Sequence, residues 1–422
     1  MKTPTFDLIV FGATSFVGRI LSRYLLERHG VNGSLRWALA ARSEARLSEL
    51  RTTLGAQASD LALVVADAAD EASLRAMCAR TRVVVSTVGP YALHGEPLVK
   101  VCAQTGTDYC DLTGEVQWIR RMIDRYEASA RKSGARIVHC CGFDSIPSDL
   151  GVHFLQRGAI GRFGVPCTRV KMRVKAMRGG ISGGTAASLM NVVEEAAGDP
   201  ALRRELSDPF SLCPPGPARG VRQPSVSFAG YDDDFGAWIA PFVMAGINTR
   251  VVHRSNALSG YAYGQGLRYD EAVIAGRGVA GGLAATGISA AMAGFMLTAA
   301  IGPSRWALRR FVLPAQGEGP SPQAQLRGFF DLRFLGRTDD GRTLRAKVTG
   351  DRDPGYGSTA KMLGEAAACL AQDLDHKDKP GGFWTPATAF GDRLIERLQA
   401  HAGVRFELVA PGDAAVSRSP AP

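Results

Sequence analysis

The sequence predicts an α/β fold: a Rossmann-like doubly wound parallel sheet, followed by a second α+β domain with an antiparallel sheet. Three observations predict it. Short apolar runs alternate with helical periodicity up to about residue 142. A glycine-containing turn at residues 12–18 joins the first strand to the first helix. From residue 169 onward, basic and apolar residues alternate strictly, as in an antiparallel strand with one buried face.

The first element is an apolar strand, residues 7–11, which runs into the turn and then into a helix with apolar residues at helical spacing. Gly12 allows a tight turn, and Gly18 allows the helix to pack close to the sheet. Amide groups at the helix start attract a pyrophosphate. Ser15 replaces the middle glycine of a related pattern, and its hydroxyl either caps the helix or contacts a phosphate. The alternative is an ordinary strand-to-helix turn. The predicted phosphate-binding residues are Gly12, Ala13, Thr14, Ser15, Phe16, Val17 and Gly18.

The next two strands bear on the choice of cofactor. The second strand, residues 35–41, ends at Arg42 and Ser43, with no carboxylate to accept from a ribose 2′-hydroxyl. An arginine beside a hydroxyl suits a 2′-phosphate, so we expect NADP(H), unless Arg42 is simply solvated at a helix start. The third strand, residues 61–66, ends at Asp67, which lies beside the adenine or caps the following helix.

The fourth strand, residues 83–88, ends at the topological switch point of the sheet. We therefore expect Val88, Gly89 and Pro90 to contact the cofactor. Tyr91 then either faces the nicotinamide pocket as a catalytic residue or packs in the core.

A fifth strand at residues 108–111, a long helix at 116–133 and a sixth strand at 135–140 complete the first domain. The chain then leaves this domain through residues 141–150. Because this stretch should line the cleft between the domains, Asp144 and Ser145 are candidate catalytic residues. The alternative is a cluster of capping residues at a helix start.

The domain boundaries follow from these patterns. We expect an NADP-binding Rossmann domain over residues 1–145 and an α+β substrate domain over 146–352. Helices in residues 353–410 should pack back on the first domain, and residues 411–422 should form a disordered tail.

Three features characterise the second domain. Residues 169–176 predict an antiparallel strand with a solvated basic face, and residues 328–335 and 343–348 predict a hairpin. Residues 179–185 form a second glycine-rich helix start, which suits an anion or thioester contact or is a flexible loop.

Composition restricts the function classes. The net charge of +10 suits acidic ligands, such as phosphates or coenzyme A, or an anionic membrane surface, or reflects an arginine-rich composition. The basic residues are scattered without a nucleic-acid-binding signature, so we expect no nucleic-acid partner. None of the eight cysteines forms a C-x-x-C pair, and no metal site is expected. Reduced thiols and the lack of an apolar signal region predict a cytoplasmic protein.

An apolar stretch, residues 279–301, contains no charged residue. Its length would span a bilayer, but its many Ala and Gly residues make its hydropathy modest. The alternatives are a buried helix, a spanning helix, or a helix that touches a membrane surface or walls an acyl pocket. Arg305, Trp306 and Arg310 follow it, a composition typical of a membrane interface. We expect it not to span, which leaves peripheral membrane contact open.

These motifs together resemble the saccharopine dehydrogenase-like oxidoreductases, and among them most of all the trans-acting enoyl reductase branch. The matching stretches cover nearly the whole chain: residues 12–18, 88–91, 108–115, 141–151, 182–185, 313–320, 353–362 and 383–386. The resemblance implies a nicotinamide-dependent reductase of lipid or polyketide acyl chains, with a carrier protein or polyketide synthase as a partner. It does not determine the substrate.

Three functions follow from this sequence. The first is NADPH-dependent reduction of an enoyl double bond in an acyl substrate. The second is an amino-acid dehydrogenase acting on an imine, which would need a cation such as Arg173 or Arg178 for the substrate carboxylate. The third is a non-catalytic NADP-binding protein on lipid surfaces. The sequence does not determine an oligomeric state.

Overall fold

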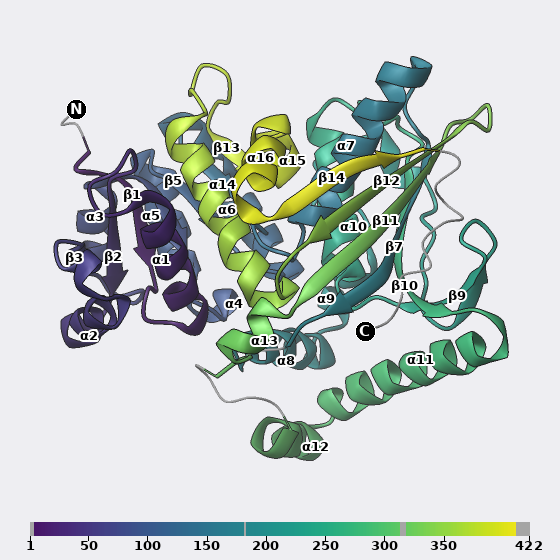
Figure 1. The fold of residues 1–422 in the computed structure, drawn as a ribbon, viewed down its shortest axis with the longest axis horizontal. Coiled ribbons are helices and arrows are strands. Elements are labelled where there is room, and N and C mark those ends of the chain that lie inside the picture. Colours follow the sequence, from purple (N-terminus) through teal and green to yellow (C-terminus); the bar gives the residue numbers. More distant parts are fainter. Residues whose placement is uncertain (1–3, 181–182, 313–317, 411–422) are drawn as a thin grey trace.

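The computed structural model describes residues 4–180, 183–312 and 318–410. The predicted disordered tail, residues 411–422, lies outside them. Two seven-stranded sheets, A and B, lie side by side with helix α14 (Thr359–Gln372) between them (Figure 1). The predicted combination of a Rossmann-like sheet and a second α+β part is confirmed.

Sheet A is parallel throughout, in the order β3-β2-β1-β4-β5-β6-β13. Six of its strands follow the doubly wound order expected of a Rossmann sheet. The seventh, β13, comes from the far end of the chain and was not predicted. The strands are β1 (Phe6–Phe11), β2 (Trp37–Ala41), β3 (Ala62–Val65), β4 (Thr81–Ser86), β5 (Asp108–Asp111), β6 (Arg136–Val138) and β13 (Gly382–Trp384). The helices around it are α1 (Phe16–His29), α2 (Glu44–Leu54), η1 (Ala56–Ala58), α3 (Glu71–Cys78), α4 (Tyr91–His94), α5 (Glu96–Thr105) and α6 (Val116–Ser133).

Sheet B has the order β14-β12-β11-β7-β10-β9-β8. Its neighbouring strands are antiparallel except β7 and β10, which are parallel. The predicted hairpin is confirmed as the pair β11 and β12. The strands are β7 (Arg169–Arg178), β8 (Gly230–Asp232), β9 (Ala237–Pro241), β10 (Arg268–Gly276), β11 (Phe329–Arg337), β12 (Thr343–Gly350) and β14 (Val404–Val409).

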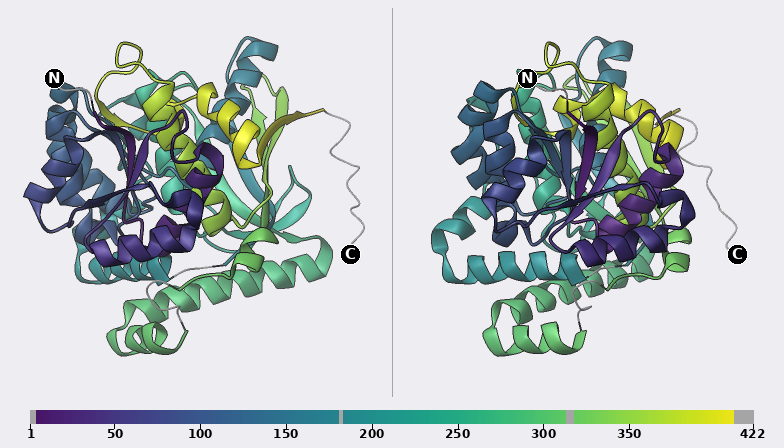
Figure 2. Two further views of the ribbon diagram at one scale, coloured as in Figure 1. Left: turned by 60° about the vertical axis from the view of Figure 1, so that its left-hand side comes forward. Right: turned by 90° about the vertical axis from the view of Figure 1, so that its left-hand side faces the viewer.

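The remaining helices connect and cover the two sheets (Figures 1 and 2). Helix α7 leads from sheet A to sheet B, and α11 and α12 lie at the edge of the molecule. Their bounds are α7 (Ile146–Phe163), α8 (Gly183–Gly198), α9 (Pro200–Ser207), η2 (Pro217–Gly220), α10 (Ala245–Leu258), α11 (Gly278–Ala300), α12 (Gly302–Ala307), η3 (Leu308–Val312), α13 (Pro322–Leu326), η4 (Pro354–Ser358), α15 (Pro386–Ala389), α16 (Asp392–Arg397) and η5 (Leu398–Ala402).

One hydrophobic core joins the two sheets. Leu8 and Val10 of β1, Leu21 of α1 and Leu363 of α14 belong to the same buried cluster as Phe334 of β11. Parallel strands covered on both faces have continuous apolar sequences, which explains the run of residues in β1. The C-terminal segment therefore serves both halves: β13 extends sheet A, β14 extends sheet B, and α14 fills the space between.

The predicted solvated basic face of β7 is wrong for the middle of the strand, whereas Arg169 and Lys175 on either side are exposed. Lys171 and Arg173 are buried, and both pair with Asp232 on β8. Arg173 also pairs with Asp270 of β10 at 2.6 Å. Buried charges are costly unless paired. At Lys171 and Arg173, the basic residues of β7 therefore meet carboxylates from other strands, and not water.

The first helix is tied to α14 by a buried polar contact. The hydroxyl of Tyr24 donates to Oε1 of Glu365 at 2.6 Å, and Arg397 donates to Oε2 at 2.9 Å. We expect Tyr24→Phe to lower the free energy of unfolding by about 1.5–3 kcal/mol, the range for a hydrogen bond to a charged group. Urea unfolding measures it. Tyr231→Phe, at a residue that is 52% exposed, is the control and should change little. Equal losses in the two variants would show that the contact adds nothing.

Candidate functional site

The glycine-containing turn has the geometry of a phosphate-binding loop. Gly12 directly follows β1 and has φ +85°, a conformation that favours glycine. A Cβ at Gly12 would lie 2.7 Å from Cγ2 of Val88, and one at Gly18 would lie 2.8 Å from the carbonyl oxygen of Ala13. Both glycines are therefore needed, so that the loop can pass close to β4 and α1 can pack close to the loop.

Ser15 has two partners in this loop. Its Oγ accepts from the amide of Gly18 at 3.0 Å, which caps α1, and lies 3.0 Å from Oγ1 of Thr87. Thr87 in turn donates to the carbonyl oxygen of Gly12 at 2.9 Å. Of the two roles considered for Ser15, the structure shows the capping role. The role of Thr87 in holding this loop was not predicted from the sequence, in which Thr87 was assigned only to the fourth strand.

The loop fits a dinucleotide pyrophosphate. Thr14, Ser15, Phe16 and Val17 are partly exposed at the start of α1, while Ala13 is buried. The first amides of a helix have no acceptor within the helix and carry its positive end. Because Gly12 and Gly18 have no side chains, an anion can come close to these amides. Their role in phosphate binding remains a prediction.

The ends of β2 and β3 form the region expected to hold the adenosine. Arg42 is exposed, and no described residue forms a hydrogen bond or ion pair with it. Ser43 caps α2 by accepting from the amide of Arg46 at 3.3 Å. Asp67 is partly exposed and accepts from the amide of Ala69 at 3.0 Å. Asp70, and not Asp67, caps α3. The guanidinium of Arg42 is thus available for contact with a 2′-phosphate.

The end of β4 lies beside the phosphate loop. Val88 is partly exposed next to Gly12, and Gly89 is exposed and followed by the buried Pro90. The side chain of Tyr91 is buried against this edge. Its hydroxyl donates to the carbonyl oxygen of Ser86 at 2.9 Å, and its ring packs against Trp118. Burial raises the pKa of Tyr91 well above its usual value. The structure therefore gives Tyr91 a packing role. Its catalytic role remains a prediction, and its hydroxyl is already engaged in a hydrogen bond to Ser86.

Asp144 has a different environment, in the loop between β6 and α7. Its side chain keeps a partly exposed face although protein surrounds most of it. This burial, with a contribution from the charge of Asp111, raises the pKa of Asp144 to about 7. Its carboxyl accepts no hydrogen bond from any other described residue. A Cβ at Gly142 would lie 2.8 Å from Oδ2 of Asp144, and one at Gly114 would lie 3.7 Å from Oδ1. Gly114 follows β5 and Gly142 follows β6, and the lack of side chains at these two glycines leaves space for the carboxyl of Asp144.

Asp111, by contrast, is fully satisfied. It accepts from Tyr109 at 2.9 Å and from the amide of Thr113 at 3.1 Å, and its Oδ2 lies 2.7 Å from Nδ1 of His139. The two neighbouring carboxyls therefore differ: Asp111 is held by several hydrogen bonds, whereas the carboxyl of Asp144 receives none from another described residue.

Ser145, the other candidate, starts a buried polar network. Its Oγ donates to Oδ1 of Asn248 at 3.0 Å. Asn248 donates to Ser148 at 3.0 Å and to Glu271 at 2.9 Å. The network joins α7, α10 and β10. The side chain of Ser145 is fully buried, so its contacts position the Asp144 loop; a catalytic role stays a prediction.

Two positioning residues were missed from the sequence. Glu115 accepts from the amides of Tyr91 and Ala92, each at 2.9 Å, and from Ser188 of α8 at 2.9 Å. Thr359 accepts from the amide of Phe143 at 2.9 Å. Each joins the edge of sheet A to a distant segment. Both residues lie in sequence motifs on which the family resemblance is based. This resemblance was the one feature of the sequence that could have indicated their importance.

The second glycine-rich stretch is only partly described. Ser182 lies outside the described residues, and α8 begins at Gly183. The amide of Gly180 donates to Oδ1 of Asp353 at 3.0 Å. The predicted anion or thioester contact stays a prediction.

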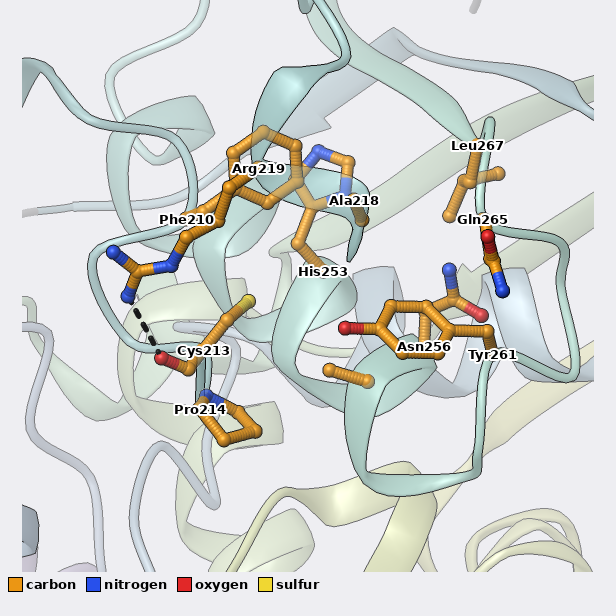
Figure 3. A pocket seen from close by; sticks show the side chains of 11 residues that line it. Phe210, Cys213, Pro214, Ala218, Arg219, His253, Asn256, Tyr261, Gln265 and Leu267 are labelled. Carbon is orange, nitrogen blue, oxygen red and sulfur yellow. Dashed lines mark hydrogen bonds between the residues drawn. The ribbon is translucent and has the colours of Figure 1, made fainter. Parts of the chain in front are cut away.

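A small cavity lies away from this site, between α10 and the chain around η2 (Figure 3). Phe210, Cys213, His253 and Tyr261 are among the residues that line it. Its volume of about 10 Å³ holds at most one water molecule. It is too small for a substrate. No group of His, Cys, Asp or Glu within the described ranges is arranged to hold a metal ion.

Comparisons with known proteins decide the family. The saccharopine dehydrogenase NADP binding domain matches residues 8–138. A trans-acting enoyl reductase of Mycobacterium ulcerans is 40% identical over 408 residues, which are 93% of this chain and 95% of that protein. The chain belongs to the trans-acting enoyl reductase family. Another relative, from Mycobacterium tuberculosis, is named a trans-acting enoyl reductase only provisionally and is 41% identical over 417 residues, or 95% of this chain and 97% of its own.

Solved structures support the fold. The apo saccharopine dehydrogenase (L-Glu forming) of Saccharomyces cerevisiae has a TM-score of 0.54, with 13% identity over 96% of this chain and 100% of that one. Homospermidine synthase of Legionella pneumophila has a TM-score of 0.50, with 10% identity over 98% of this chain and 94% of that one. The resemblance inferred from the motifs is confirmed. This member of the trans-acting enoyl reductase family is an oxidoreductase that uses a nicotinamide cofactor.

Proposed function

We propose that the protein is an NADPH-dependent enoyl reductase that saturates the carbon–carbon double bond of an acyl substrate. One observation carries the proposal beyond the names of its relatives. A carboxyl with a pKa of about 7, free of hydrogen bonds from other described residues, lies at the edge of sheet A where β5 and β6 end. Ligands of doubly wound sheets bind at this edge.

The chemistry explains why this carboxyl matters. NADPH, when bound, supplies a hydride for the β-carbon of the substrate. The protein must then deliver a proton to the α-carbon. Asp144 is about half protonated near neutral pH, which is the condition for an efficient general acid. We assign Asp144 as the proton donor, with Glu115, Ser145 and Thr359 as positioning residues.

The substrate is proposed to arrive on a separate protein. The relatives are named trans-acting, which suits an acyl chain presented by a carrier protein or polyketide synthase. Carrier-bound acyl groups are linked through a phosphate-containing arm, and the net charge of +10 favours such an acidic partner.

The alternative of an amino-acid dehydrogenase needs a free cation to bind the substrate carboxylate, and one of the two candidates is already paired. Arg173, one of the two arginines considered for a substrate carboxylate, is buried and paired with Asp232 and Asp270. Arg178 remains exposed at the end of β7. The alternatives separate in one assay: NADPH consumption with α,β-unsaturated acyl thioesters, and with an amino acid plus an aldehyde. Consumption only with the second pair would refute the proposal. Binding of NADPH without consumption of either would favour the non-catalytic alternative.

We expect NADPH to bind more tightly than NADH, because Arg42 is exposed at the tip of β2 where no carboxylate accepts from a ribose. In Arg42→Ala, the loss of one charge-assisted contact should weaken NADPH binding by about 1.5–3 kcal/mol. The affinity for NADH, which lacks the 2′-phosphate, is the internal control and should not change. Calorimetric titration of both cofactors into both proteins measures this. Equal affinities in the wild type would contradict the assignment.

A further inference from the structure

Helix α11 exposes an apolar face that nothing in the described structure covers. It has no charged residue, and it is the one helix among the described residues that is long and apolar enough to cross a membrane. Its buried residues are small: Gly281, Ala285, Ser289 and Ala299. The opposite side is exposed, with Leu283 at 71% and Leu297 at 66%. The alternative of a buried helix is therefore wrong.

The buried side fixes α11 along the body of the protein. A Cβ at Gly281 would meet the backbone of Gly276 at 3.1 Å or less, and one at Gly282 would lie 3.2 Å from the ring of Trp238 on β9. The start of the helix thus packs against β9 and the end of β10 through close contacts that only small residues allow, and Ala299 near its other end packs with Met190 and Val193 of α8. Crossing a membrane would break these contacts, so the helix is placed to lie on a surface.

Aromatic and basic side chains gather beyond its C-terminal end. Trp306 and Phe311 are 64% and 72% exposed, with ring centroids 5.8 Å apart. The guanidinium of Arg310 lies 5.7 Å from the ring of Phe311. Arg277, at the other end of α11, is also exposed. Aromatic rings beside arginine are typical of the boundary between lipid headgroups and acyl chains.

We propose that the exposed face of α11, together with α12 and η3, rests in the surface of an anionic lipid bilayer. The apolar side chains would enter the acyl boundary, with Arg277 and Arg310 at the headgroups. Charge favours lipid over a second copy of this chain, because two copies with a net charge of +10 repel each other, whereas anionic lipid attracts them. Figures 1 and 2 show α11 and α12 on one edge of the molecule, outside the two sheets, where a flat surface can reach them.

The surface lies one helix away from the candidate site. On α8, Met190 and Val193 pack with Ala299 of α11, while Ser188 donates to Glu115 at the edge of sheet A. Bilayer contact would therefore place the candidate site near acyl chains. The proposal goes beyond the reductase function and does not depend on which reaction the site catalyses.

Flotation of the full-length protein with vesicles tests the proposal. Vesicles of phosphatidylcholine with phosphatidylglycerol should bind the wild type, and rising salt should release it. Leu283→Gln and Trp306→Ser should each weaken binding by about tenfold, the loss expected for one buried apolar side chain. Ile160→Gln, at another exposed apolar residue on α7, is the matched control and should bind as the wild type does. NADPH affinity and thermal unfolding confirm that each variant folds.

Several outcomes would overturn the proposal. These are no binding to anionic vesicles, equal binding of all variants, or binding to phosphatidylcholine alone at all salt concentrations. A dimer in lipid-free solution that Leu283→Gln dissociates would make this face a protein interface. Protein that only detergent releases from vesicles after a carbonate wash would indicate a spanning helix.

Discussion

Asp144→Asn is expected to lower kcat by about 10²–10⁴-fold, the range for loss of a general acid, while NADPH binds as in the wild type. Asparagine keeps the size of the side chain in the space left by Gly114 and Gly142 but cannot donate the proton. Because the surrounding protein raises the pKa of Asp144 to about 7, the wild-type kcat should fall as the pH rises through about 7. In the variant this pH dependence should disappear. Stopped-flow measurements of NADPH oxidation across pH give both results.

Asp149→Asn is the matched control for Asp144. Burial also raises the pKa of Asp149 to about 7, but this carboxyl is fully buried and accepts from Ser255 at 2.5 Å and from the amide of Ala387 at 2.7 Å. It holds α7 to α10 and α15. We expect its loss to lower thermal stability and to leave the pH profile of kcat unchanged. If Asp144→Asn behaved like Asp149→Asn, the proton donor would lie elsewhere.

Ser15→Asp is expected to abolish NADPH binding while the fold survives. An aspartate can still accept from the amide of Gly18, so α1 keeps its cap. Its charge, however, would lie at the helix start where a pyrophosphate binds. Two unit charges about 4 Å apart repel by about 4 kcal/mol at an effective dielectric constant of about 20. This corresponds to about a thousandfold loss of affinity, measurable by calorimetry.

Ser15→Asn separates charge from shape. Asparagine caps helices about as well as serine and carries no charge, so this variant should bind NADPH far more tightly than Ser15→Asp. Equal losses would attribute the effect to the contact with Thr87 and not to phosphate repulsion. Undiminished affinity in Ser15→Asp would show that the residues between Gly12 and Gly18 are not the phosphate loop.

Local sequence patterns predicted the first sheet well. The strand at β1, the turn from Gly12 to Gly18 and the start of α1 are adjacent in sequence, so their geometry depends on neighbouring residues. The hairpin of β11 and β12 is local for the same reason. β13 was missed because its pairing partner, β6, lies more than two hundred residues earlier. β14 likewise gains its role only by pairing with β12.

Side-chain roles were harder to predict than elements. The alternation of basic residues in β7 suggested contact with water, because Asp232 lies 61 residues from Lys171 in sequence and only the sheet brings them together. Tyr91 follows a switch-point strand, yet the turn into α4 directs its hydroxyl back to Ser86. Asp144 was a candidate because the stretch that leaves the first domain was expected to line the cleft between the domains. Its environment depends on Gly114 and Asp111, which only the structure brings close.

The central claim is that this site delivers a hydride to the β-carbon and a proton to the α-carbon of an enoyl group. The most direct test is to incubate the protein with an α,β-unsaturated acyl thioester and NADPH that carries deuterium at its transferable position. Mass spectrometry and NMR then locate the label in the product. We predict a saturated thioester with deuterium at the β-carbon and a solvent-derived hydrogen at the α-carbon. Deuterium on the carbonyl carbon, with the double bond intact, would contradict the claim.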